Sequence, residues 1–490
     1  MLFLVFLIGF FLLCRITVHN SILERIGFAL PTGLAFVTLS MTIMDWADIA
    51  LTRSSLTTLT IVLLIVAVAA NYNQPKALLR QFVPQKLDFT WFNLLWVGML
   101  GVVVYLEYIN FNKCMVYPTY DRDSLAAFDT IGYICAQEHT FHAMSIFDPV
   151  YFPHMHQAGS SISYLPMVQL SYAYVYTFGA ATSKAVPAFI YLGFLFGFYG
   201  LCRKGMSHTG SMLVLLGIVT APEMLSFASH SVTNVMQACM ASAGIVYACL
   251  WINNRKQHDL WLAILLLAIN NWMRAEGIVF VGTAWLLVII SVCKHKDWKN
   301  ALLPVLSLIP LVVWELYSKA CGLTSDNAII THLYWDSEKA KTIFNGAWAL
   351  FSGGTYYGLT FHIFAIIAII MIFNGANLSI CSLVYEKNGV KRKKSLLEIS
   401  FLNYTDTPIS KIVFKALVIS VIAYYFVLYQ VDYKWDSVDN VLAYSAKRFN
   451  FCYVPIAWYF IACSTLVNKP LTWLEKKTGL GGKLDFSHNK

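Results

Sequence analysis

The sequence predicts an all-α, polytopic membrane protein with about thirteen transmembrane helices and a large outer loop that carries amphipathic surface helices. Only 12% of the 490 residues are charged, whereas soluble proteins carry about 25%. Hydrophobic residues make up 58% of the chain, and they fall in blocks of roughly 17 to 22, enough for a helix to cross about 30 Å of hydrocarbon. Because a backbone in lipid must satisfy its own hydrogen bonds, such blocks indicate transmembrane helices. We therefore expect residues 1–490 to form a single integral membrane domain.

The predicted spans follow one another along most of the chain. They lie near residues 1–18, 28–47, 54–71, 91–110, 184–202, 211–228, 233–252, 258–273, 275–293, 301–317, 355–374, 411–430 and 449–467. The first block lacks a basic start and a small-residue cleavage site, so we interpret it as an uncleaved span rather than a signal peptide. A further apolar segment, residues 163–179, is expected to be a helix lying on, or dipping into, the outer face.

The net charge of +9 is concentrated in short basic clusters between spans. These clusters are Arg203-Lys204, Arg255-Lys256, residues 294–299 and residues 387–394. They follow the positive-inside pattern of membrane proteins and do not indicate binding to nucleic acid; contact with anionic membrane lipids is compatible with them. With the basic clusters in the cytoplasm, residues 111–183 form the first large outer loop and residues 376–410 a basic cytoplasmic loop.

Two charged residues interrupt an otherwise apolar stretch, "NNWMRAEGIVF" at residues 270–280. Arg274 and Glu276 are predicted to lie at a tight outer turn between two short spans. Ionisable groups at membrane depth are costly, so they usually pair, face water or bind a charged ligand. Two interpretations stay open, namely an ion pair that caps two helix ends and a site for a charged ligand.

The first outer loop begins with two aspartates, Asp121 and Asp123, that flank Arg122. Behind them, apolar residues recur at helical spacing and predict an amphipathic surface helix. These residues are Leu125, Phe128, Ile131 and Cys135. An aspartate at such a position can cap the helix, and a partly desolvated carboxylate can act as a general base.

Other polar residues are predicted on the same face. Lys447 and Arg448 begin the last span, where they can bind an anionic group or simply extend toward the interface. Glu223 and His230 flank another outer turn. The histidines of the first loop do not favour a metal site, because no carboxylate lies at a recognisable ligand spacing. These histidines are His139, His142, His154 and His156.

In their order along the chain, four of these elements resemble motifs of the GT-C superfamily of polytopic glycosyltransferases, which use polyprenyl-phosphate sugars. The likeness is to the bacterial aminoarabinose transferases and protein O-mannosyltransferases, and it covers roughly residues 90–467. The matching stretches are "YDRDSLAAF", "FPHMHQAGSSISYLPMVQL", "NNWMRAEG" and "AKRFNFCYVPIAWYF", with "GGTYYGL" similar to a weaker element. The chain departs from relatives at "DTIGYI", where some have a basic residue, and at "SHSVTN", where several have an acidic one.

The resemblance implies an inverting glycosyl transfer without a cofactor, a divalent metal not being favoured. Asp123, or else Asp121, is then the base for the acceptor hydroxyl. Arg274, Lys447 and Arg448 bind the lipid phosphate, and preorganised cations of this kind often supply the largest catalytic effect.

The resemblance also implies supporting residues, a location and partners. Glu276 and His230 support the groups above, and His154 and His156 lie in a loop that contacts donor or acceptor. The location implied is a bacterial inner membrane, with the site facing the periplasm. Its partners are a polyprenyl-phosphate sugar, an acceptor that is glycan, lipid or protein, and membrane lipids. The main alternative is a transporter or lipid flippase for an anionic substrate, although such proteins often show internal repeats and we detect none here.

Overall fold

The structure is a computed structural model, and its described residues cover most of the chain. They are residues 1–17, 21–71, 94–147, 164–323, 329–331, 334–375, 382–387, 390–395, 407–433 and 437–478. In this part of the chain the secondary structure is almost entirely helical, so the predicted all-α class is confirmed.

The helices follow one another along the whole described part of the chain. Those of the first half are α1 (Leu2–Ile16), α2 (Ile22–Trp46), α3 (Arg53–Ala69), α5 (Leu94–Val116), α6 (Asp129–Glu138), α7 (Met167–Thr177), α8 (Ala185–Cys202), α9 (His208–Val219), α10 (Pro222–Phe227) and α11 (Asn234–Asn254). Those of the second half are α12 (Gln257–Met273), α13 (Ile278–His295), α14 (Ile309–Ala320), α15 (Ser337–Ser352), α16 (Gly354–Tyr357), α17 (Thr360–Gly375), α18 (Pro408–Gln430), α19 (Val438–Val441), α20 (Lys447–Phe449), α21 (Tyr453–Cys463) and α22 (Thr465–Thr478).

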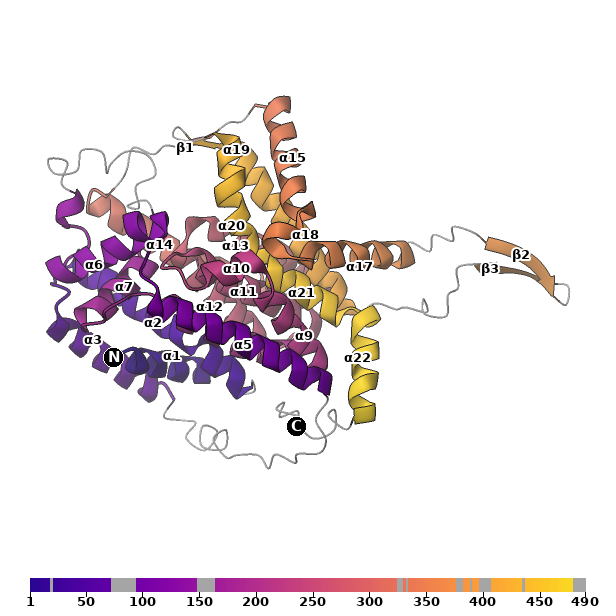
Figure 1. The fold of residues 1–490 in the computed structure, drawn as a ribbon, viewed down its shortest axis with the longest axis horizontal. Helices are drawn as coiled ribbons and strands as arrows, with labels where there is room; N and C mark the ends of the chain where they lie inside the picture. Colours follow the sequence, from indigo (N-terminus) through magenta and orange to yellow (C-terminus); the bar gives the residue numbers. More distant parts are fainter. Residues whose placement is uncertain are drawn as a thin grey trace.

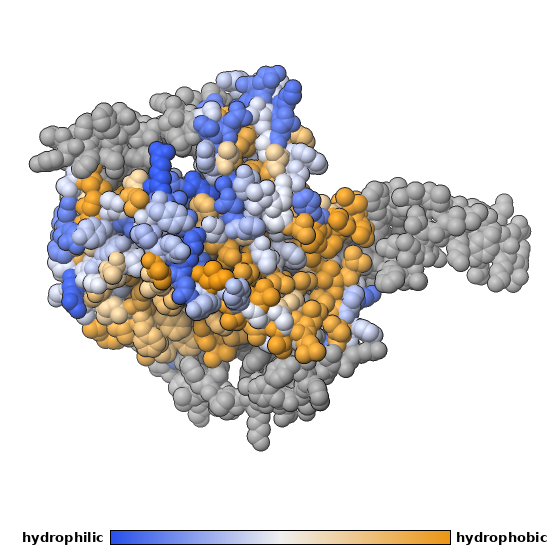
Figure 2. All heavy atoms as spheres, viewed as in Figure 1, coloured by the Kyte–Doolittle hydropathy of each residue, from blue (hydrophilic) through white to orange (hydrophobic). Residues whose placement is uncertain are grey.

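Helix α11 is the centre of the hydrophobic core. Every residue from Asn234 to Trp251 is buried, and α11 packs against α8, α12, α13, α18 and α21. Figure 1 shows α11, α12 and α13 in the middle of the body, with α15 and α19 rising on one side. An apolar band crosses the visible surface, and hydrophilic residues gather above it (Figure 2).

Seven helical segments in the described residues are long and apolar enough to cross a membrane, or eight if one bent pair counts as a span. They are Ile22–Trp46, Leu94–Val116, Ala185–Cys202, Asn234–Asn254, Ala275–His295, Trp298–Ala320 and Pro408–Gln430, and the bent pair joins Val438–Cys463 to Thr465–Glu475. This is consistent with a multi-pass membrane protein. Each of the thirteen predicted segments contains a helix, but thirteen spans are not confirmed.

Several predicted spans are too short, as single helices, to cross a bilayer. Helix α12 has 17 residues, which at 1.5 Å per residue cover about 26 Å, less than the roughly 30 Å of hydrocarbon. The segment predicted at residues 211–228 is divided in two, because Pro222 begins a new helix after Val219.

The first outer loop forms helices where the sequence predicts them, but one residue of the predicted apolar face is turned to the surface. Residues Ser124–Phe128 form a π-helical turn that leads into α6. The wider turn moves Leu125 off the apolar face, so Leu125 is 48% exposed while Phe128, Ile131 and Cys135 are buried. The apolar segment expected at the outer face forms α7, whose residues Met167–Val175 are buried within the protein.

Two short antiparallel strand pairs accompany the helices. Strand β1 (Ile329–Thr331) pairs with β4 (Val431–Tyr433) in the register Ile330 to Asp432. Strand β2 (Ser382–Lys387) pairs with β3 (Val390–Ser395), with Tyr385 opposite Arg392. The β2–β3 hairpin lies in the segment 376–410, which the sequence predicts only as a basic connecting loop.

Glycines allow the first helices to pack closely. Gly27 in α2 lies against Gly197 in α8, so closely that a Cβ atom on Gly27 would overlap the backbone of Gly197. Small residues at helix contacts are typical of membrane proteins, where close backbone packing replaces the hydrophobic effect. Gly98 in α5, by contrast, has no atom of another described segment within 4 Å of an added Cβ.

We predict that Gly27→Ala destabilises the protein by about 1–3 kcal/mol, the usual cost of overpacking a core. Gly98→Ala is the control, because it adds the same methyl group in open space. Thermal unfolding in detergent, followed by circular dichroism, measures both. Equal midpoints for the two variants would contradict the close α2–α8 contact.

Candidate functional site

Six charged side chains from four separate stretches of the chain meet on one side of the helical body. They are Asp123, Glu223, Arg274, Glu276, Lys447 and Arg448, and we call them the charged cluster. Tyr164 lies within electrostatic range of four of them, namely Asp123, Arg274, Glu276 and Arg448. The structure therefore brings together one predicted base and all three predicted phosphate-binding cations.

The turn at Arg274 is built by its neighbours in "NNWMRAEG". Helix α12 ends at Met273, and Arg274 is extended. Asn270 donates to the carbonyl of Gly277 at 3.4 Å, and Asn271 donates to the carbonyl of Ser307 at 2.9 Å. A Cβ atom on Gly277 would collide with both asparagine side chains, so the turn requires glycine.

The Arg274 guanidinium is held in place by three contacts. Its Nε and Nη2 donate to the two carboxylate oxygens of Glu276 at 3.1 and 2.7 Å. Its Nη1 donates to Thr233 Oγ1 at 3.3 Å, and its Cζ lies 5.3 Å from the ring centre of Tyr164. This geometry is compatible with both interpretations of the turn. The ion pair joins α12 to α13, as a purely structural pair would, and it also orients Arg274, as a site for a charged ligand would require.

Asp123 and Arg448 form an ion pair across 325 positions of the chain. Arg448 Nε also donates to the carbonyl of Tyr444 at 3.1 Å. Each partner adjoins a π-helical turn, Ser124–Phe128 directly after Asp123 and Leu442–Ala446 just before Lys447. Such turns are rare and frequent at functional sites. The side chain of Asp123 is 40% exposed, so its carboxylate is accessible from outside.

Lys447 pairs with Glu223, a residue of α10, at 2.7 Å. Its ammonium lies 4.7 Å from the ring centre of Tyr356, and its carbonyl accepts a hydrogen bond from Tyr357 Oη at 2.7 Å. These tyrosines belong to "GGTYYGL". The sequence did indicate this stretch, but it did not assign a role to Glu223 or predict that the tyrosines contact Lys447.

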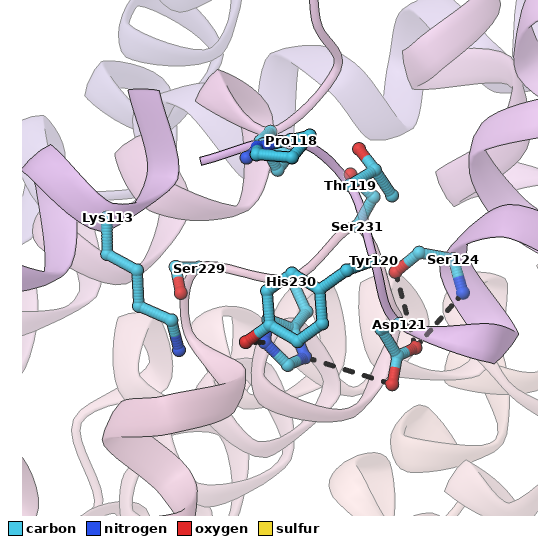
Figure 3. A pocket seen from close by; sticks show the side chains of 10 residues that line it. Lys113, Pro118, Thr119, Tyr120, Asp121, Ser124, Ser229, His230 and Ser231 are labelled. Carbon is cyan, nitrogen blue, oxygen red and sulfur yellow. Dashed lines mark hydrogen bonds and ion pairs between the residues drawn. The ribbon is translucent and has the colours of Figure 1, made fainter. Parts of the chain in front are cut away.

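Asp121 lies on the other side of Asp123 and caps the helix. Its Oδ2 accepts a hydrogen bond from the backbone N–H of Ser124 at 3.1 Å, as expected for a capping aspartate. His230 Nδ1 lies 4.0 Å from Asp121 Oδ1, and His230 Nε2 shares a 2.9 Å hydrogen bond with Tyr120 Oη. Figure 3 shows Tyr120, His230, Asp121 and Ser124 in this chain of contacts.

The structure describes two of the four histidines of the first loop, His139 and His142. His154 and His156 lie outside the described residues. His142 binds Asp45 at 2.8 Å through Nδ1, and Asp45 also accepts from Tyr317 Oη at 2.5 Å. Within the described ranges no three histidine, cysteine or acidic side chains gather as a metal site.

We predict that His230 makes the fold sensitive to acid. Burial lowers the pKa of its imidazole, Lys113 and Lys184 add to this effect, and Asp121 and Glu223 oppose it. The unfolded chain, with a histidine pKa of about 6.5, then takes up the proton at a higher pH than the folded one, so stability falls as the pH drops below about 6.5.

Melting temperatures at pH 7.5 and 5.5 measure this effect. We expect a smaller drop between the two pH values in His230→Gln than in the wild type. The same drop in both proteins would show that His230 is not the group responsible.

No family model, no curated protein and no solved structure matches the chain. We therefore infer the role of the site from the chemistry of its own residues.

Proposed function

We propose that this chain is a membrane-bound glycosyltransferase that moves a sugar from a polyprenyl-phosphate donor to an acceptor hydroxyl, with inversion. The observation that carries the proposal is the charged cluster, in which a partly exposed aspartate lies among three cations. A phosphate leaving group requires cations that stabilise its developing charge. An acceptor hydroxyl requires a base within hydrogen-bonding reach.

In the proposed mechanism, donor binding releases the base. Arg448 is paired with Asp123 in the structure, and a donor phosphate would take over Arg448. The freed Asp123 carboxylate then accepts the proton of the acceptor hydroxyl, with Asp121 as the alternative base. The hydroxyl oxygen attacks the anomeric carbon, the bond from that carbon to the phosphate oxygen breaks, and the phosphate leaves with the electron pair. Arg274, oriented by Glu276, and Lys447 stabilise the leaving charge.

An apolar groove beside the cluster supports a lipid donor. It lies between α15 and α18, with a volume of about 850 Å³, and aromatic side chains dominate its lining. Phe351 and Tyr425 line it with ring centres 6.1 Å apart. Tyr425 accepts a hydrogen bond of 3.0 Å from Asn450, two residues after Arg448. A hydrocarbon chain in this groove would bring its phosphate toward the cations.

The orientation we propose follows from the basic residues. Arg255 and Lys256 precede α12, and Lys294 and Lys296 lie at the end of α13. They are thus at the opposite ends of the two helices that meet at Arg274. Basic residues favour the cytoplasmic side, so the charged cluster would face outward. We propose about thirteen membrane-crossing segments in a bacterial inner membrane, with the cluster on the periplasmic side.

A transporter or flippase for an anionic substrate is the second candidate, and Glu107 favours it. Glu107 is buried in α5, where Asn110 donates to one of its oxygens at 3.4 Å. Its Oε2 has no hydrogen-bond partner among the described residues. Carboxyl groups inside a membrane often mark ion pathways. Passage of a labelled anionic solute into liposomes, with sugar donors left intact, would support this candidate.

We predict that Asp123→Asn lowers sugar transfer by about 10²- to 10⁴-fold, the usual contribution of a general base. Arg274→Ala should also lower transfer, because it removes a phosphate-binding cation. The assay uses purified protein, a panel of polyprenyl-phosphate sugars and membrane extract as the acceptor. Donor binding, measured separately, should persist in Asp123→Asn.

Asp439→Asn is the matched control, since Asp439 is an exposed aspartate of α19 outside the cluster. Full activity in Asp123→Asn would move the role of base to Asp121. Failure of every donor to bind the wild-type protein would overturn the glycosyltransferase proposal.

A further inference from the structure

A small pocket lies next to the charged cluster, on the side of Asp121. It is lined by Lys113 near the end of α5, residues 118–121, Ser124, Lys184 just before α8, and residues 229–231. It contains about 230 Å³ of empty space, part of it open to solvent, and its inner part has room for about one water molecule. Figure 3 shows Lys113, Ser229 and His230 around this space.

Two lysines of the pocket, Lys113 and Lys184, form no ion pair with a carboxylate of the described residues. Lys184 is only 5% exposed, and its ammonium donates to the carbonyl of Tyr117. Lys113 donates to the carbonyl and hydroxyl oxygens of Ser226, at 3.2 and 3.4 Å. No carboxylate oxygen in the described ranges lies within 4.0 Å of either ammonium.

The two lysines of the pocket differ in this respect from the cations of the charged cluster. There, Arg274, Lys447 and Arg448 each bind a carboxylate. Burying a charge is costly unless it is paired, and each ammonium has three hydrogens to donate. Lys113 and Lys184 thus lack direct contact with a carboxylate among the described residues and retain unused donors.

Other groups make the pocket suitable for an anion. The N-terminus of α8, which carries a positive partial charge, begins directly after Lys184. His230 is 8% exposed, and its Nδ1 has no hydrogen-bond partner among the described residues. Asp121 also lines the pocket, and Asp129 lies within electrostatic range of Lys184, but neither carboxylate is within 4.0 Å of a lysine ammonium in the described residues.

We propose that this pocket is a second oxyanion site, which binds a phosphate group through Lys113 and Lys184. One phosphate oxygen enters the inner space near His230, and the others remain at the open mouth. The site is separate from the three ion-paired cations, so it does not depend on the proposed sugar transfer. If that transfer takes place, Asp121 and Asp123 lie between two phosphate sites.

The experiment follows His230 itself. The full chain in a neutral detergent carries isotope-labelled histidine, and the ring signal of His230 is assigned with His230→Gln. Titration with inorganic phosphate should shift this signal to saturation. In Lys113→Gln, half-saturation should require about tenfold more phosphate or worse, because a charge-assisted hydrogen bond is lost. Lys184→Gln should weaken phosphate binding as Lys113→Gln does, and Lys184→Arg should retain phosphate binding.

Two variants serve as controls for Lys113→Gln. Lys319→Gln removes an exposed lysine that contacts Glu315, and Arg448→Gln removes a cation of the charged cluster. Both should leave half-saturation unchanged within about twofold, a difference of about 0.4 kcal/mol. Lys113→Gln is the variant to rely on if Lys184→Gln fails to fold, since Lys113 is only partly buried.

The source of the phosphate is tested in a second titration, with phosphatidic acid in place of inorganic phosphate and phosphatidylcholine as the blank. A Lys113-dependent shift with phosphatidic acid alone would assign the pocket to a lipid headgroup, and one with inorganic phosphate to a soluble group. The proposal is overturned if neither ligand shifts the His230 signal, or if Lys113→Gln responds like the wild type. The proposal is also overturned if Arg448→Gln is the only variant that abolishes the shift of the His230 signal, because phosphate would then bind at the charged cluster.

Discussion

The pairing of charges within an apolar helical body is the constraint on which the rest of this structure depends. Ionisable groups removed from water need a partner, and here the partners come from different helices. Arg274 and Glu276 join α12 to α13. Asp123 with Arg448, and Glu223 with Lys447, tie the first half of the chain to its last helices. Elsewhere, Lys204 bridges Glu24 and Asp259 at 2.9 and 2.8 Å.

The backbone adjusts locally to make these pairs possible. Gly277 allows the tight turn that brings Arg274 and Glu276 together. The two π-helical turns beside Asp123 and Lys447 rotate the following residues relative to a regular helix. Close glycine contacts bring the backbones of α2 and α8 together. The site thus depends on irregularities that the regular helices on either side support.

Two regions near Asp121 and Asp123 differ in whether their cations contact carboxylates. In the charged cluster every cation has a carboxylate, so an incoming phosphate would exchange partners rather than meet free charge. In the pocket of Lys113 and Lys184, carbonyl and hydroxyl oxygens accept the hydrogen bonds of the described residues, and no carboxylate among these residues contacts either ammonium directly. Asp121 and Asp123 lie between these regions, one capping a helix and the other bound to Arg448.

The sequence by itself determined the helical class, the apolar segments and the turn at Arg274, because hydrophobic blocks and isolated charges are local properties. It also placed Asp123, Arg274, Lys447 and Arg448 on one face. Only the tertiary structure decided which charges pair, since Asp123 and Arg448 are 325 positions apart. The groove between α15 and α18 and the pocket that holds Lys113 and Lys184 likewise arise from packing between distant segments, which no local pattern encodes.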